Sequence, residues 1–102
     1  MSEKEKVDKA IKLYNDGKYQ EAIDAFSSVL EVCQDNAELY NNIALCYANL
    51  GEYEKAEKYY LKAQELNPKL AQVYINLADI YYRRKDMASG IGLVTTGLVE
   101  LP

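Results

Sequence analysis

"LGEYEKAEKYYLKAQELNP", residues Leu50 to Pro68, is half-repeated elsewhere in the chain. A shift of 34 residues superimposes four earlier positions on this stretch: Gly17 on Gly51, Tyr19 on Tyr53, Ala22 on Ala56 and Phe26 on Tyr60. Self-similarity at a fixed period of this length is typical of proteins built from stacked structural repeats. The quoted stretch therefore belongs to one copy of a repeat.

The middle copy carries two amphipathic stripes. Apolar residues recur every three or four positions from Leu39 to Leu50, and again from Tyr53 to Leu66. This spacing is typical of helices that bury one face. Gly51 interrupts the pattern between the stripes, and Pro68 follows the second one, as expected where a helix ends. The copy is therefore predicted to be an antiparallel helix hairpin.

Three copies cover the chain as residues 3–36, 37–70 and 71–102, with no linker between them. A lone hairpin cannot bury both of its apolar stripes, so neighbouring hairpins must stack and share a core. Residues 1–102 are thus expected to form a single all-α solenoid domain of three hairpins, or about six helices.

Small residues recur where helices are expected to approach closely. Ala10, Ala44 and Ala78 take the same place in the three first helices, and Ala22 and Ala56 share a place in the second helices. Small side chains let helix axes come together, and tyrosine rings are expected to fill the remaining volume.

Composition narrows the classes of function. A chain of 102 residues suits one small domain, and its net charge of -4 disfavours a nucleic-acid partner. No apolar run is long enough to span a membrane, and the polar N-terminus lacks the apolar segment of a signal peptide, so a cytoplasmic location is expected. Cys33 and Cys46 are too few for a disulfide framework or a metal site. No cofactor is expected.

The chain resembles three tandem tetratricopeptide repeats, whose pattern W-x2-L-G-x2-Y…A-x3-F…P it follows over nearly its whole length. The middle copy fits best, with these residues at the pattern's positions: Tyr40, Ile43, Ala44, Tyr47, Ala56, Tyr60 and Pro68. The resemblance implies a right-handed superhelix.

The third copy departs from the pattern. Lys85 stands at the turn glycine, Met87 at the turn tyrosine and Gly90 at the packing alanine. Its last predicted helix is apolar on more than one side, whereas a terminal repeat should present a polar face to water. Either the chain is truncated from a longer array, or two chains stack end to end through residues 88–101. The candidate self-association residues are Ile91, Val94, Leu98 and Leu101.

Catalysis finds no support in the sequence, which has no histidine and no recognisable nucleophile with a general base. The resemblance instead implies a non-catalytic scaffold, whose first helices line a concave groove that binds an extended peptide or a partner helix. Carried over by position, the groove residues are Ile11, Tyr14, Asn15, Asn42, Leu45, Asn49, Asn76, Asp79, Tyr82 and Arg83, with further positions at Asp8, Glu38, Asn41, Gln72 and Ile75.

Asn42 and Asn76 are equivalent positions whose amides either grip a peptide backbone or are simply solvated. Of the family's two-carboxylate clamp for acidic chaperone tails only Asn42 remains, because its other places are taken by Val7, Ile11, Gln72 and Asn76. An acidic peptide would also meet Glu38 and Asp79, so the predicted partner is a neutral to mildly basic protein or peptide.

Two other functions remain open from the sequence. A structural assembly module could self-associate as a homo-oligomer through its C-terminal helix, by stacking or by swapping. An RNA-binding helical repeat is disfavoured by the acidic balance and by a period that stays at 34 throughout.

Overall fold

The computed structural model describes residues 2–84, and these residues form helices and connecting turns without any strand. Five helices follow one another along the chain: α1 (Glu3–Asn15), α2 (Tyr19–Leu30), α3 (Ala37–Asn49), α4 (Tyr53–Leu66) and α5 (Ala71–Arg83). The second predicted helix of the third copy, with Ile91, Val94, Leu98 and Leu101, lies outside the described residues. None of the five helices is long and apolar enough to cross a membrane.

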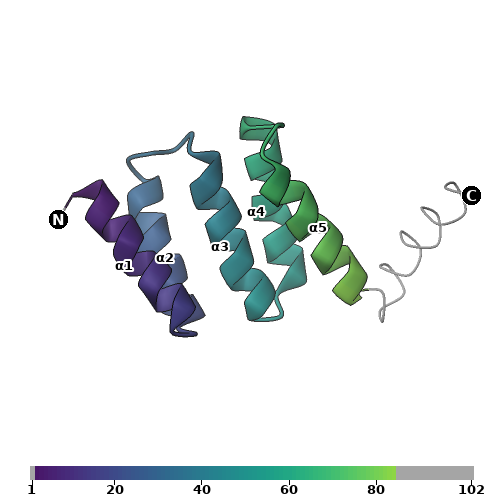
Figure 1. Ribbon diagram of the computed structural model, residues 1–102, viewed down its shortest axis with the longest axis horizontal. Helices are drawn as coiled ribbons and strands as arrows, with labels where there is room; N and C mark the ends of the chain where they lie inside the picture. Colours follow the sequence, from purple (N-terminus) through teal and green to yellow (C-terminus); the bar gives the residue numbers. More distant parts are fainter. Residues whose placement is uncertain (1, 85–102) are drawn as a thin grey trace, which may run out of the picture.

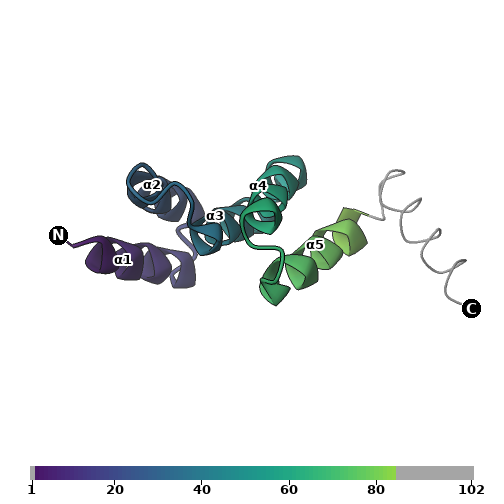
Figure 2. The same cartoon turned by 90° about the horizontal axis from the view of Figure 1, so that it is seen from above.

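The helices stack side by side in a row (Figure 1). Turned by 90°, the row shows α2 and α4 on one side, α1 and α5 on the other, and α3 between them (Figure 2). The prediction of an all-α helical repeat is confirmed. This arrangement places the first helix of each hairpin along a common surface, where the groove was expected.

Local signals explain where the helices begin. The Ser2 hydroxyl accepts a hydrogen bond from the Glu5 backbone N–H at 3.2 Å, while the Glu5 carboxylate accepts from the Ser2 backbone N–H. This reciprocal pair satisfies two N–H groups that the first turn leaves without helical partners. At the start of α3, the Asn36 side chain accepts from the Leu39 backbone N–H at 3.2 Å.

Glycine closes the turn inside each complete hairpin. Gly17 and Gly51 have φ values of 79° and 80°, in the left-handed region. Their amides donate to the carbonyls of Tyr14 and Ala48, each at 3.0 Å. Only glycine adopts this backbone without steric cost, which explains why the two positions match in the repeat.

We expect Gly51→Ala to lower the free energy of unfolding by about 1 kcal/mol, because a Cβ is disfavoured at positive φ. Nothing lies within 4 Å of where that Cβ would stand, so the cost is conformational rather than a clash. Gly51→Asn should cost less, since asparagine tolerates this region better. Urea unfolding followed by circular dichroism measures both variants, and an equal loss for the two would contradict this explanation.

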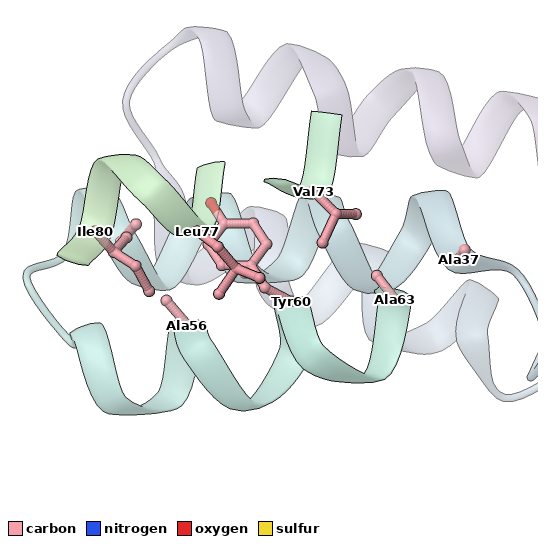
Figure 3. Close-up of a cluster of buried hydrophobic side chains, with 9 residues drawn as sticks. Ala37, Ala56, Tyr60, Ala63, Val73, Leu77 and Ile80 are labelled. Carbon is pink, nitrogen blue, oxygen red and sulfur yellow. The ribbon is translucent and has the colours of Figure 1, made fainter. Parts of the chain in front are cut away.

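The core consists of two clusters that share α3. One surrounds Phe26 of α2 and draws on α1 and α3. The other surrounds Tyr60 of α4, with Val73, Leu77 and Ile80 of α5 beside it (Figure 3). Because α3 contributes to both clusters, neighbouring hairpins form one continuous core, as stacked repeats require.

The alanines of the first two copies pack as predicted. Ala10, Ala22, Ala44 and Ala56 are fully buried. Ala78 is exposed, and the second helix of its own copy, on which it was expected to pack, lies outside the described residues, so the expectation for Ala78 stays a prediction. The apolar residues by which α5 packs on α4 lie on one stripe of the helix, and Ala78 projects from another side at about 100° per residue.

Polar contacts also join α5 to the preceding hairpin. The Tyr81 hydroxyl donates to the Glu57 carboxylate, and Arg84 Nη1 lies 3.3 Å from the other oxygen of that carboxylate. Burial, together with the bond to Glu57, raises the pKa of Tyr81 to about 12. The hydroxyl therefore stays protonated as a donor at neutral pH.

Candidate functional site: the concave groove

A cavity of about 250 Å³ opens between α1 and α3 on the face expected to bind a partner. Three apolar and three polar side chains line it: Ile11, Phe26 and Leu45, with Tyr14, Asn15 and Asn42. The structure thus brings together five of the ten groove residues that the sequence predicts. The cavity is smaller than the roughly 300–1,000 Å³ typical of sites for whole drug-sized ligands. Its size suits a side chain of a larger partner.

Phe26 is the lining residue that the sequence reading missed. It comes from α2, a second helix, and its side chain is only 1% exposed. The repeat pattern assigns this position to helix packing, and the ring does pack there. Phe26 lines the cavity only because of the distance between α1 and α3. The spacing of residues along one helix does not predict the distance between two helices.

Asn49 braces the cavity wall instead of facing a partner. Its Nδ2 donates to the Tyr14 hydroxyl at 3.1 Å and to the Leu45 carbonyl at 2.8 Å. The Tyr14 ring also meets the Tyr19 ring edge-on, with centroids 5.4 Å apart. Because an amide group has two hydrogens, these two bonds use its donor capacity. Asn49 therefore orients Tyr14 across the junction between α1 and α3.

Asn42 and Asn76 have different surroundings despite their equivalent positions. Asn42 lies half-buried in the cavity lining, and its side-chain amide makes no hydrogen bond to another residue within 2–84. Asn76 Nδ2 instead donates to Asn41 Oδ1 at 3.0 Å. Asn41 itself is 5% exposed, so it is buried between α3 and α5 and does not present its amide to a partner as the sequence reading expected.

The α5 part of the predicted groove lies beyond the cavity. Asp79 and Arg83 form an ion pair with 3.0 Å between Oδ2 and Nε, and both side chains are about half exposed. Ile75 and Tyr82 are 65% and 59% exposed. This end of the surface therefore combines apolar area with a pair of charges that neutralise each other.

The thiols are poor candidates for chemistry. Burial raises the pKa of Cys46 to about 11. Cys33 Sγ donates to Glu3 Oε2 at 3.2 Å, and this bond is the main reason that the Cys33 pKa is raised. Thiolates are the reactive species, so both groups are weak nucleophiles at neutral pH. Within the described residues, no three acidic, cysteine or histidine side chains gather as metal ligands.

Two family models match the chain in overlapping ranges. Residues 37–70 match the model described as "Tetratricopeptide repeat", and residues 12–51 match one described as "TPR repeat". Together the matches span more than half of the chain. The chain belongs to the tetratricopeptide repeat family. The division into three tetratricopeptide repeats with a degenerate third stays a prediction.

One curated protein is similar to this tetratricopeptide chain in sequence. Photosystem I assembly protein Ycf3 of Cyanophora paradoxa is 33% identical over 81 residues, covering 76% of this chain and 47% of that protein. The chain therefore spans less than half the length of this relative.

Among solved structures, the first tetratricopeptide domain of Spaghetti (RPAP3), bound to the HSP90 peptide SRMEEVD, has a TM-score of 0.78 at 24% identity. The matched region covers 86% of this chain and 72% of the Spaghetti domain's chain. The type III secretion translocator chaperone SycD of Yersinia enterocolitica has a TM-score of 0.79 at 18% identity, over 98% of this chain and 78% of that one. At such identities the likeness shows the fold alone.

Proposed function

We propose that this chain is a non-catalytic protein-interaction scaffold whose concave groove binds an extended peptide. The observation that carries the proposal is the cavity between α1 and α3, which three apolar and three polar side chains line. A solved relative of the same fold, the Spaghetti domain, binds a peptide, which supports this use of the fold.

The cavity suits one apolar side chain of the peptide. Ile11, Leu45 and Phe26 supply the apolar surface, and an aliphatic side chain buried there would gain about 1.5–3 kcal/mol from the removal of apolar area from water. Asn42 and Asn15 stand beside this surface with amides that both donate and accept. A peptide backbone offers the same two kinds of group, so the two asparagines would hold the main chain while the cavity holds the anchor.

The charge of the groove favours a neutral to mildly basic peptide. The positions beside the cavity include the exposed acids Asp8 and Glu38, and Arg83 is already paired with Asp79. A peptide that carries several carboxylates would meet Asp8 and Glu38 without a matching clamp. The partner proposed for this chain therefore differs from the acidic peptide bound by the Spaghetti domain.

Selection from a random octapeptide library tests the proposal. Bound sequences should be enriched in Leu, Ile or Val at one position and should carry a net charge of zero or above. The double variant Asn15→Ala, Asn42→Ala should weaken the best peptide about tenfold or more, since two hydrogen bonds are lost. Asn76 is left unchanged, because its amide joins α3 to α5 and its loss would disturb packing.

Lys58→Gln on α4 is the matched control, and it should leave groove binding unchanged. Enrichment of acidic peptides, or equal affinity for wild type and the asparagine variant, would overturn the proposal. The predicted self-association through Ile91, Val94, Leu98 and Leu101 has no support from the described residues, and light scattering over a range of concentrations decides it.

A further inference from the structure

A second pocket, of about 430 Å³, lies between α3 and α4 and has a different chemistry from the groove. Three tyrosines and three lysines line it: Tyr40, Tyr47, Tyr59, Lys55, Lys58 and Lys62. The Tyr59 ring stacks on Tyr47, with centroids 5.5 Å apart, and lies 6.1 Å from Tyr40. The rings therefore form a continuous aromatic floor bordered by ammonium groups.

The tyrosine–lysine pocket lies on the face of α3 opposite the groove. Tyr40 and Tyr47 lie on one stripe of α3, and Asn42 lies roughly 140–160° around the helix from them at about 100° per residue. Figure 2 shows α4, which carries the three lysines, on the side away from α1 and α5. A ligand bound here would not compete with a peptide in the groove.

The lysines follow one line along α4. At about 1.5 Å of rise per residue, Lys55 and Lys62 stand about 10 Å apart along the helix axis, and Lys58 and Lys62 about 6 Å apart. A single phosphate or carboxylate is too small to contact all three. Carboxylates at alternate residues of an extended chain stand about 6.5 Å apart on one side, which matches the spacing of Lys58 and Lys62.

The three lysines differ in how far they are already neutralised. Lys55 Nζ pairs with Glu52 at 3.2 Å and lies 5.6 Å from the centre of the Tyr47 ring. Lys62 makes a long contact of 4.0 Å with Glu65, and both side chains are substantially exposed. Lys58 makes no ion pair within residues 2–84. Lys58 and Lys62 are thus the two cations with charge to offer an incoming anion.

The acids nearby limit the length of such an anion. Glu52 and Glu65 stand at the two ends of the pocket, where they pair with Lys55 and Lys62. The charge of Asp24 on α2 is also close enough to help raise the pKa of Tyr47. A nucleic acid carries its charges continuously and would run on to these acids. A short acidic peptide segment needs only the two or three charges that the lysines can balance.

We propose that the tyrosine–lysine pocket is a second binding site, which takes a short, extended acidic segment of a partner protein. Two carboxylates at alternate residues contact Lys58 and Lys62, and an adjacent apolar or aromatic side chain packs on the rings of Tyr47 and Tyr59. The site goes beyond the groove function, and it would let the scaffold hold two segments of opposite charge preference at once.

The probe is a synthetic peptide with glutamates at three alternate positions and one phenylalanine, compared with the same peptide carrying glutamines. We expect the glutamate peptide to bind at least about fivefold more tightly at low salt, and its affinity to fall as salt screens the charges. Lys58→Gln with Lys62→Gln should remove that preference. Fluorescence anisotropy of labelled peptides measures each affinity.

The matched control is Lys4→Gln with Lys69→Gln, which makes the same change in net charge at two exposed lysines away from the pocket. It should change the affinity by less than about twofold. Equal binding of the two peptides, or equal weakening by the control, would overturn the proposal. So would tighter binding, dependent on Lys58 and Lys62, of a single-stranded RNA oligonucleotide or of anionic vesicles.

The two proposed sites fail separately. If the tyrosine–lysine pocket is a separate site, the variant Asn15→Ala, Asn42→Ala loses affinity for groove peptides but still binds the acidic probe. The variant Lys58→Gln, Lys62→Gln should conversely keep the affinity for peptides selected on the groove. If the asparagine variant instead weakens the acidic probe, that probe binds in the groove and the second site is refuted.

Discussion

Replacing Tyr60 with alanine is expected to lower the free energy of unfolding by about 3–5 kcal/mol. The side chain is 1% exposed and lies between α4 and α5, against Val73, Leu77 and Ile80 (Figure 3). Removing a buried ring loses both its transfer from water and the packing of its neighbours around the cavity left behind. Natural domains of this size are stable by only about 5–15 kcal/mol, so the loss is a large share of the total.

Urea unfolding followed by the helical circular dichroism signal measures this loss. Tyr82→Ala is the matched control, because the same side chain is removed where it is 59% exposed. The control should change the free energy of unfolding by less than about 1 kcal/mol. Similar losses for Tyr60 and Tyr82 would show that the packing between α4 and α5 is not what stabilises the repeat.

The second large effect concerns the buried amide pair between α3 and α5. Asn41→Leu is expected to cost about 1–3 kcal/mol, because Asn76 Nδ2 loses its acceptor in a half-buried position. The double variant Asn41→Leu, Asn76→Leu should be more stable than the sum of the two single losses predicts, since no amide is then left without its partner.

A double-mutant cycle in urea gives the interaction free energy of the pair directly. We expect coupling of about 1 kcal/mol or more, because the two residues are in contact and share one hydrogen bond. Additive losses in the cycle would instead mean that water already satisfies both amides. The bond would then contribute nothing to holding α5 against α3.

Much of the fold was predictable from the sequence because its signals are local. The period that places Gly17 on Gly51 predicted the turns of the first two hairpins, and both glycines do occupy the left-handed region that their turns require. The alanine positions of the first two copies predicted close helix packing, which Ala10 and Ala44 confirm.

The candidate site was predictable only in part. Ile11, Tyr14, Asn15, Asn42 and Leu45 meet around one cavity, as their positions on the first helices indicated. The period alone also treated Asn42 and Asn76 as alike. They differ because the Asn76 amide on α5 donates a hydrogen bond to Asn41 on α3, a residue 35 positions away in the chain.

The sequence by itself determined the helical period, the turn glycines and the faces that each helix buries, since these depend on residues within about four positions of one another. The tertiary structure alone decided which polar groups are occupied and which remain for a partner. Asn49 braces Tyr14, while Lys58 borders an aromatic pocket without an ion pair to any residue of 2–84. These outcomes depend on the distance and angle between helices, which are set by the packing of side chains far apart in sequence.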